Sequence, residues 1–229
     1  MGVLLPFLFL VPAVLVAIPV HEIGHAIAAY FLGDRSVRYF GYFSADPRRF
    51  IDPYGVLAVA FALVGWGRRV PVQANRISTN GQKVLLELGG PAANLAVAIV
   101  LGVALRLIHP GNNVAVGIAW EIVYATWFLN VSIFAFQLLP IPGLDGWNIV
   151  EALFRRSNPR FFFNVDVRRR EVWAGIVIVL FGFVFLLRIN LLNFAMLPFY
   201  EPASLISLGR CDGYATTVTV LAPCLQSVR

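Results

Sequence analysis

Two histidines and a glutamate lie close together in the first apolar stretch of the chain, in the order His21, Glu22, Ile23, Gly24, His25. Because His21 and His25 are one helical turn apart, their imidazoles share one helix face, where two nitrogens can bind one zinc ion. Glu22 is then placed to act as a general base on a water that the metal activates. Ionisable groups at membrane depth cost several kcal/mol unless they have a partner. We therefore interpret the pattern as a metal site rather than as a chance match.

The histidine motif supplies two ligands, whereas a catalytic zinc site uses three protein ligands and one open position. Three further residues are candidates for the third ligand: His109, Glu121 and Asp145. His109 is interpreted as an interfacial loop residue, and the role of Glu121 stays open. Asp145 is the best candidate, because Pro140 and Pro142 interrupt the end of the preceding helix and aim the carboxylate inward. An ordinary cytoplasmic turn is the alternative interpretation of Asp145.

The composition indicates an integral membrane protein. Hydrophobic residues make up 59% of the 229 residues, charged residues make up 13%, and the mean hydropathy is +0.77. Soluble domains carry about 45–50% apolar and about 25% charged residues, so these values exclude a disordered chain, a collagen-like repeat and an ordinary cytosolic domain. A membrane-spanning helix needs about 20 mostly apolar residues. Four stretches meet or approach that length: residues 3–32, 84–108, 114–139 and 172 to about 198.

These stretches predict an all-α polytopic membrane protein with four to six transmembrane helices. Residues 54–66 are apolar but short for a span, and residues 37–43 are β-prone, so we expect a re-entrant or β-containing segment after the first helix. Most of the 18 Lys and Arg residues lie between the first and second stretches and between the third and fourth. The positive-inside rule places both of these loops in the cytoplasm and both termini outside. This topology and contact with anionic lipid account for the net charge of +6, and we expect no binding of nucleic acid.

The two ends of the chain leave several interpretations open. The first stretch has no basic region before it and no small-residue cleavage site, so we expect a retained helix rather than a signal peptide. Arg188 interrupts the fourth stretch, which either ends early or lets this side chain reach the interface. Cys211 and Cys224 lie in the predicted outer tail, where they form a disulfide in one interpretation and are two unpaired thiols in the other.

Several motifs in this chain resemble those of the site-2 protease family of intramembrane zinc metalloproteases. Residues 21–25 match the family's HExxH motif, residues 139–146 match its LDG motif, and residues 90–94 match a GPxxN signature on the intervening helix. Residues 52–55 and 65–72 are similar to the segment that short members carry after the first helix. The resemblance covers most of residues 3–150 and is greatest to the short prokaryotic branch without PDZ or CBS domains.

The resemblance implies roles for the site residues. It implies that Glu22 is the catalytic base and that one zinc ion is held by His21, His25 and Asp145. Family members usually have Asn eight residues before the ligand Asp, where this chain has Gln137, which keeps the amide but is one methylene longer. Gln137 and Asn94 are candidates for substrate contact or for stabilising the oxyanion, and helix packing is the alternative for Asn94. For Asn130 we expect an interhelical hydrogen bond.

The resemblance also implies a function, a zinc endopeptidase of the prokaryotic plasma membrane. It would cleave transmembrane-helix proteins in or near their membrane segments, in regulated proteolysis or signal-peptide removal. Residues 1–200 would form the protease domain and residues 201–229 an extracytoplasmic tail. Gln137 supports an alternative, a catalytically weak relative that binds metal and acts as a membrane-protein scaffold. A metal transporter is disfavoured because one ligand cluster is visible, and the sequence does not predict an oligomeric state.

Overall fold

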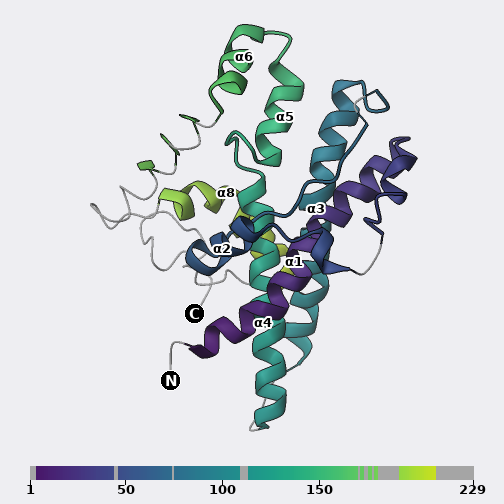
Figure 1. Cartoon of the computed structure of the whole chain (residues 1–229). Helices are drawn as coiled ribbons and strands as arrows, with labels where there is room; N and C mark the ends of the chain where they lie inside the picture. Colours follow the sequence, from purple (N-terminus) through teal and green to yellow (C-terminus); the bar gives the residue numbers. More distant parts are fainter. Residues whose placement is uncertain are drawn as a thin grey trace.

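The computed structural model describes residues 4–43, 46–73, 75–108, 113–169, 171–172, 175–176, 178–179 and 191–209. Within these residues the chain is helical, and its β structure consists of one isolated bridge between Ile51 and Gly67. The helices, shown in Figure 1, are α1 (Leu4–Phe31), η1 (Arg35–Arg38), η2 (Pro47–Arg49), α2 (Pro53–Ala62), α3 (Asn80–Leu107), α4 (Val114–Gln137), α5 (Asp145–Phe154), α6 (Pro159–Val167) and α8 (Leu191–Leu208).

Three of these helices are long and apolar enough to cross a membrane: Phe9–Phe31 within α1, Asn80–Leu107 and Val114–Gln137. They correspond to the first three predicted stretches, and the described residues confirm the predicted all-helical architecture with three candidate membrane spans. Most of the fourth stretch lies outside the described residues, as do His109, Arg188, Cys211 and Cys224. The total of four to six spans and the disulfide therefore stay predictions.

The three long helices pack into one bundle. α1 and α4 run in the same direction and α3 runs against them, with α8 beside α3 and α4 (Figure 1). The main core joins α3, α4 and α8 through buried Ala98, Trp127, Met196 and Tyr200. The indole of Trp127 donates a hydrogen bond to the Ser207 hydroxyl oxygen (3.0 Å). The parallel course of α1 and α4 brings the turn after α4 to the histidine-bearing part of α1.

α1 and α3 approach each other closely through glycines. A Cβ atom added at Gly24 would lie 2.7 Å from the Ala93 Cβ, and one added at Gly89 would lie 2.7 Å from the Ala28 Cβ. Neither position has room for a methyl group, so the backbones of the two helices contact each other directly, as in other membrane helix pairs with small interface residues. Gly24 inside the histidine motif is therefore required by helix packing.

The described residues between α1 and α3 form no sheet. The sequence suggested a β-prone stretch over residues 37–43, and this prediction is wrong, because η1 ends there and turns follow. The Asp34 carboxylate accepts hydrogen bonds from the Ser36 backbone N–H (3.0 Å) and hydroxyl (2.6 Å), which close the chain into a tight turn. Asp34 also accepts a hydrogen bond from the Gln73 N–H (2.7 Å), which ties the end of α1 to the segment before α3.

α2 is too short to cross a bilayer, since ten helical residues span about 15 Å and the hydrocarbon core is about 30 Å thick. Asp52 caps α2 by accepting hydrogen bonds from the backbone N–H groups of Tyr54 (2.8 Å) and Gly55 (3.2 Å). Leu63 ends the helix in a left-handed conformation (φ 56°). The chain then returns to α1, where Gly67 lies against the Glu22 side chain.

Candidate metal centre

Three buried side chains converge where α1 meets the start of α5. The Nε2 atoms of His21 and His25 are 3.1 Å apart. The Asp145 Oδ2 atom lies 3.0 Å from the His21 Nε2 and 3.1 Å from the His25 Nε2. All three residues are less than 9% exposed. The structure thus brings together the three residues that the motifs singled out. Their ligand atoms are close enough to one another to hold one metal ion.

The second nitrogen of each imidazole shows which tautomer the histidines adopt. The Nδ1 of His21 lies 2.7 Å from the Asn94 side-chain oxygen, and the Nδ1 of His25 lies 2.8 Å from the Leu86 carbonyl oxygen. Because both partners accept, each Nδ1 carries the hydrogen and donates it. When both rings are neutral, their Nε2 lone pairs point toward each other and toward a carboxylate oxygen. A metal cation between these atoms would satisfy all three, and the donor set fits zinc.

Asp145 reaches this position because α4 stops early. α4 ends at Gln137, and the chain turns through Gly143 (φ 104°) before α5 starts at Asp145 itself. Burial alone would raise the pKa of Asp145, but positive charge on the His25 and His21 imidazoles outweighs burial and holds that pKa below its usual range. A metal cation bound between the same atoms would favour the ionised carboxylate in the same way. The expected interruption by Pro140 and Pro142 is confirmed.

Glu22 lies beside the three converging side chains. It is 3% exposed, and its Oε2 atom has no hydrogen-bond partner in the part of the chain that the structure describes. The side chain lines a cavity of about 470 Å³, whose wall also includes Trp66, Gly67 and Gln137 together with the His21, His25 and Asp145 side chains. The Glu22 side chain lines this cavity next to the candidate cation site, where a carboxylate is suited to accept a proton from water.

The two predicted amides have different surroundings. Gln137 is buried on the cavity wall and donates a long hydrogen bond to the Gly65 carbonyl (3.3 Å). Asn94 accepts from His21 and donates both amide hydrogens, to the Ala17 carbonyl (2.9 Å) and to the Asn130 side-chain oxygen (2.8 Å). The expected interhelical hydrogen bond of Asn130 is thus present. Asn94 is part of a buried polar chain that joins α1, α3 and α4.

The chain is similar to proteins named as zinc metalloproteases. It is 32% identical to "Putative zinc metalloprotease YwhC" of Bacillus subtilis over 150 residues, which cover 63% of this chain and 68% of that protein. It is 34% identical to "Putative zinc metalloprotease Rip2" of Mycobacterium tuberculosis over 161 residues, which cover 67% of this chain and 60% of that protein. The chain belongs to the site-2 protease-like zinc metalloproteases. No family model and no solved structure matches it.

In this site-2 protease-like chain, the names of the relatives and the donor set both indicate zinc. The same structure explains the glycine of its GPxxN signature. A Cβ atom at Gly90 would lie 2.7 Å from the His21 Cε1 and would also collide with the His25 Nε2. Because Gly90 has no side chain, the two imidazoles can occupy this space. Asn94, one helical turn later, orients the His21 imidazole.

Two charged residues of the site-2 protease-like centre were missed by sequence reasoning. The Arg69 guanidinium lies 3.4 Å from the Asp145 Oδ1, 3.3 Å from the Gly143 carbonyl and 3.9 Å from the Glu87 Oε2. Glu87 also accepts a hydrogen bond from the Asn148 side chain (2.9 Å). Arg69 is one of many arginines in its loop, so no pattern distinguished it. Glu87 in an apolar stretch was a signal, because an intramembrane acid needs a partner.

Proposed function

We propose that this chain is an intramembrane zinc endopeptidase that hydrolyses peptide bonds in or near the transmembrane segments of other membrane proteins. The observation that carries the proposal is the convergence of two lone-pair-bearing imidazoles and one carboxylate within about 3 Å, beside a glutamate with an uncommitted oxygen. In this proposal one zinc ion is held by His21, His25 and Asp145. When bound, zinc polarises the scissile carbonyl and lowers the pKa of water.

The other steps of the proposed hydrolysis are assigned to side chains around the metal centre. Glu22 takes a proton from the attacking water and passes it to the amine that leaves. Asn94 and the Leu86 carbonyl hold the imidazoles in the tautomer that presents Nε2. Because both amide hydrogens of Asn94 are already donated, we assign it positioning rather than stabilisation of the oxyanion. Gln137, on the cavity wall, is the amide that can contact the substrate.

The proposed substrate must lose its helical hydrogen bonds before its peptide carbonyl can be attacked. Residues 68–73 have no regular secondary structure and follow the Ile51–Gly67 bridge next to Glu22. We place the pairing with an unwound substrate at the backbone groups of this segment that the chain itself does not use. In the proposed orientation the basic loops face the cytoplasm, residues 54–66 re-enter the bilayer from that side, and water enters from there. The host membrane is a prokaryotic plasma membrane.

The decisive experiment compares Glu22→Gln with the wild type on a panel of single-span membrane proteins in detergent or liposomes. We expect wild-type zinc content with cleavage reduced about 10²- to 10⁴-fold, the range for loss of a general base. Glu121→Gln in α4 is the matched control and should cleave at the wild-type rate. Equal cleavage by Glu22→Gln and the wild type refutes the assignment. A wild-type protein that holds zinc but cleaves no member of the panel supports a scaffold instead.

Zinc content tests the ligand set independently of substrate. His21→Ala, His25→Ala and Asp145→Ala should each lose most of the bound zinc, because each removes one of three protein ligands. Full zinc retention by purified, monodisperse Asp145→Ala would exclude this carboxylate as a ligand.

A further inference from the structure

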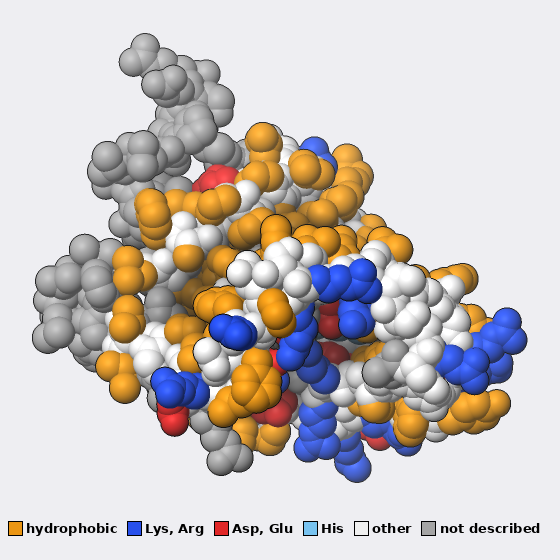
Figure 2. Space-filling model, turned by 90° about the horizontal axis from the view of Figure 1, so that it is seen from above, with side chains coloured by type: hydrophobic (Ala, Val, Ile, Leu, Met, Phe, Trp, Pro, Cys, Tyr) orange, Lys and Arg blue, Asp and Glu red, His pale blue; other side chains and the backbone are white. Residues whose placement is uncertain are grey.

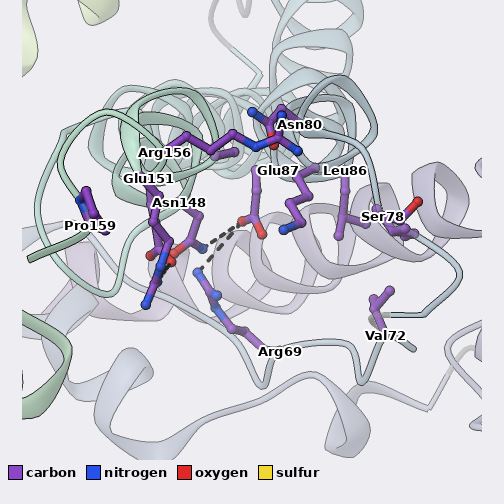
Figure 3. Close-up of a pocket in the computed structure, with 14 residues that line it drawn as sticks. Arg69, Val72, Ser78, Asn80, Leu86, Glu87, Asn148, Glu151, Arg156 and Pro159 are labelled. Atoms are coloured by element: carbon purple, nitrogen blue, oxygen red, sulfur yellow. Dashed lines mark hydrogen bonds and ion pairs between the residues drawn. The ribbon is translucent and has the colours of Figure 1, made fainter. Parts of the chain in front are cut away.

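A second cavity, of about 680 Å³, lies between α3 and α5 (Figure 3). Its wall combines apolar groups with charged and polar side chains, which include Lys83, Glu87, Asn148, Glu151, Arg155 and Arg156. Arg69 lines both this cavity and the metal-centre cavity. We call this space the α3–α5 cavity. Nothing in the proposed hydrolysis uses it.

Two of its positive charges are already balanced. Arg69 pairs with Asp145 and Glu87, and Figure 3 shows Arg69 and Asn148 directed toward Glu87. Arg155 pairs with Glu151 in the same helix segment and with Asp166 (2.8 Å) across the turn to α6. The acids of the cavity wall, Glu87 and Glu151, are therefore both engaged by arginines.

The other two positive charges are not balanced. Lys83 on α3 and Arg156 after α5 are exposed and line the cavity, and neither side chain has an ion pair or hydrogen bond within the described ranges of the chain. The cavity thus offers two cations from two different elements to a ligand. Its apolar wall, made by Val72, Ile77, Leu86, Ala152 and Pro159, can accommodate the uncharged part of the same ligand.

The location of the cavity corresponds to a membrane interface. α3 has 28 residues and is about 42 Å long, which exceeds the hydrocarbon core of about 30 Å. We place the excess length at its first turns, which carry Lys83 and follow the basic loop, so that they extend into the headgroup region. Figure 2 views the molecule from the end that carries α5 and α6, and it shows Lys and Arg side chains gathered around a hollow that contains acidic side chains. Phe161 and Phe163 of α6 are more than half exposed, as in helices that lie at an interface.

We propose that the α3–α5 cavity binds the glycerol-linked phosphate of an anionic phospholipid, with Lys83 and Arg156 on the phosphate and the apolar wall on the glycerol and upper acyl carbons. Basic pockets between membrane helices on the cytoplasmic side are suited to such headgroups. Because α5 begins with Asp145, a lipid that joins α3 to the end of α5 also steadies the element that carries this carboxylate. The proposal concerns a separate site and does not depend on proteolytic activity.

The test measures lipid binding to the full chain in a neutral detergent. Native mass spectrometry, with titration of phosphatidylglycerol or phosphatidylcholine, reports the affinity of each lipid. We expect tighter binding of phosphatidylglycerol, weakened about 5-fold by Lys83→Ala or Arg156→Ala and about 30-fold by both. Arg160→Ala combined with Arg168→Ala is the matched control, because it removes two exposed arginines from the same region that do not line the cavity. The control should bind phosphatidylglycerol like the wild type.

Three outcomes would overturn the proposal. One is equal weakening by the cavity pair and the control pair, which would indicate attraction by overall charge. A second is binding of soluble glycerol phosphate that depends on Lys83 and Arg156 while lipid binding does not, which would identify a free-anion site. A third is saturation of the cavity by an acidic peptide with no dependence on lipid, which would identify a protein-docking site. Zinc content of the double variant should stay at the wild-type value, which shows that the chain is folded.

Discussion

Replacement of Gly90 by alanine is a direct test of the metal-centre geometry. The new methyl carbon would lie 2.7 Å from the His21 Cε1 and from the His25 Cδ2, and closer still to the His25 Nε2, whereas ordinary contact begins at 3.4 Å. The rings must therefore move by at least about 0.7 Å. Bonds from zinc to histidine are about 2.0–2.1 Å long and tolerate about ±0.2 Å. We expect zinc affinity to fall about 10- to 100-fold, the range for disturbing the groups that orient metal ligands.

The measurement is competition for zinc between purified protein and a chromophoric chelator, with cobalt absorption as a second readout of ligand geometry. Gly81→Ala, also in α3, is the control, because no atom lies within 4 Å of the added methyl group. Alanine is favoured over glycine in helices by up to about 1 kcal/mol, so this control should bind zinc normally and be at least as stable as the wild type. Wild-type zinc affinity in folded Gly90→Ala would show that the imidazoles do not lie against this glycine.

Three further outcomes are expected. Asn94→Ala should lower zinc affinity about 10- to 100-fold, because it removes the hydrogen bond that orients His21. Asn130→Ala leaves that hydrogen bond intact and should mainly lower the melting temperature. Equal zinc affinities of these two variants would refute the positioning role of Asn94. Burial alone would raise the pKa of Asp34, but hydrogen bonds from Ser36 and Gln73 outweigh burial and hold that pKa below its ordinary value. The stabilisation of the folded chain by ionised Asp34 is therefore complete above about pH 4 and is lost as pH falls through the lower folded pKa. Asp34→Asn should lower the free energy of unfolding by about 2 kcal/mol at pH 7 and by less in acid. A difference in the free energy of unfolding that stays constant with pH would contradict this. Chelation of zinc should lower the melting temperature of the wild type and restoration of zinc should recover it, because a ligand that binds only the folded chain stabilises it.

The sequence predicted those parts of the site that local geometry determines. The spacing of His21 and His25 follows from helix periodicity. The arrival of Asp145 follows from the parallel course of α1 and α4 and from the prolines that interrupt the chain. The role of Asn94 could not be predicted, because the direction of an amide in an apolar helix depends on neighbours from α1 and α4 that the sequence does not place.

Tertiary context decided other features. The β-prone residues 37–43 follow directly on η1, whose start Asp34 caps through Ser36, and they continue as turns, so the local context outweighs intrinsic propensity. Arg69 could not be distinguished from neighbouring arginines such as Arg68, because its proximity to Asp145 arises only after the segment behind α2 folds back onto α1. The close α1–α3 approach was signalled in advance by Gly24, since a glycine costs about 1 kcal/mol in a helix interior.

The separation of the ligands along the chain has a consequence for biogenesis. His25 and Asp145 are 120 residues apart, and the partners that orient the imidazoles come from α3. A nascent polypeptide that has inserted α1 alone holds two rings without an orienting carbonyl and without a carboxylate. Under the proposed function, hydrolytic capacity is thus withheld from the ribosome-bound chain until synthesis has passed Asp145, so the first helix can sit among other newly inserted helices without cutting them.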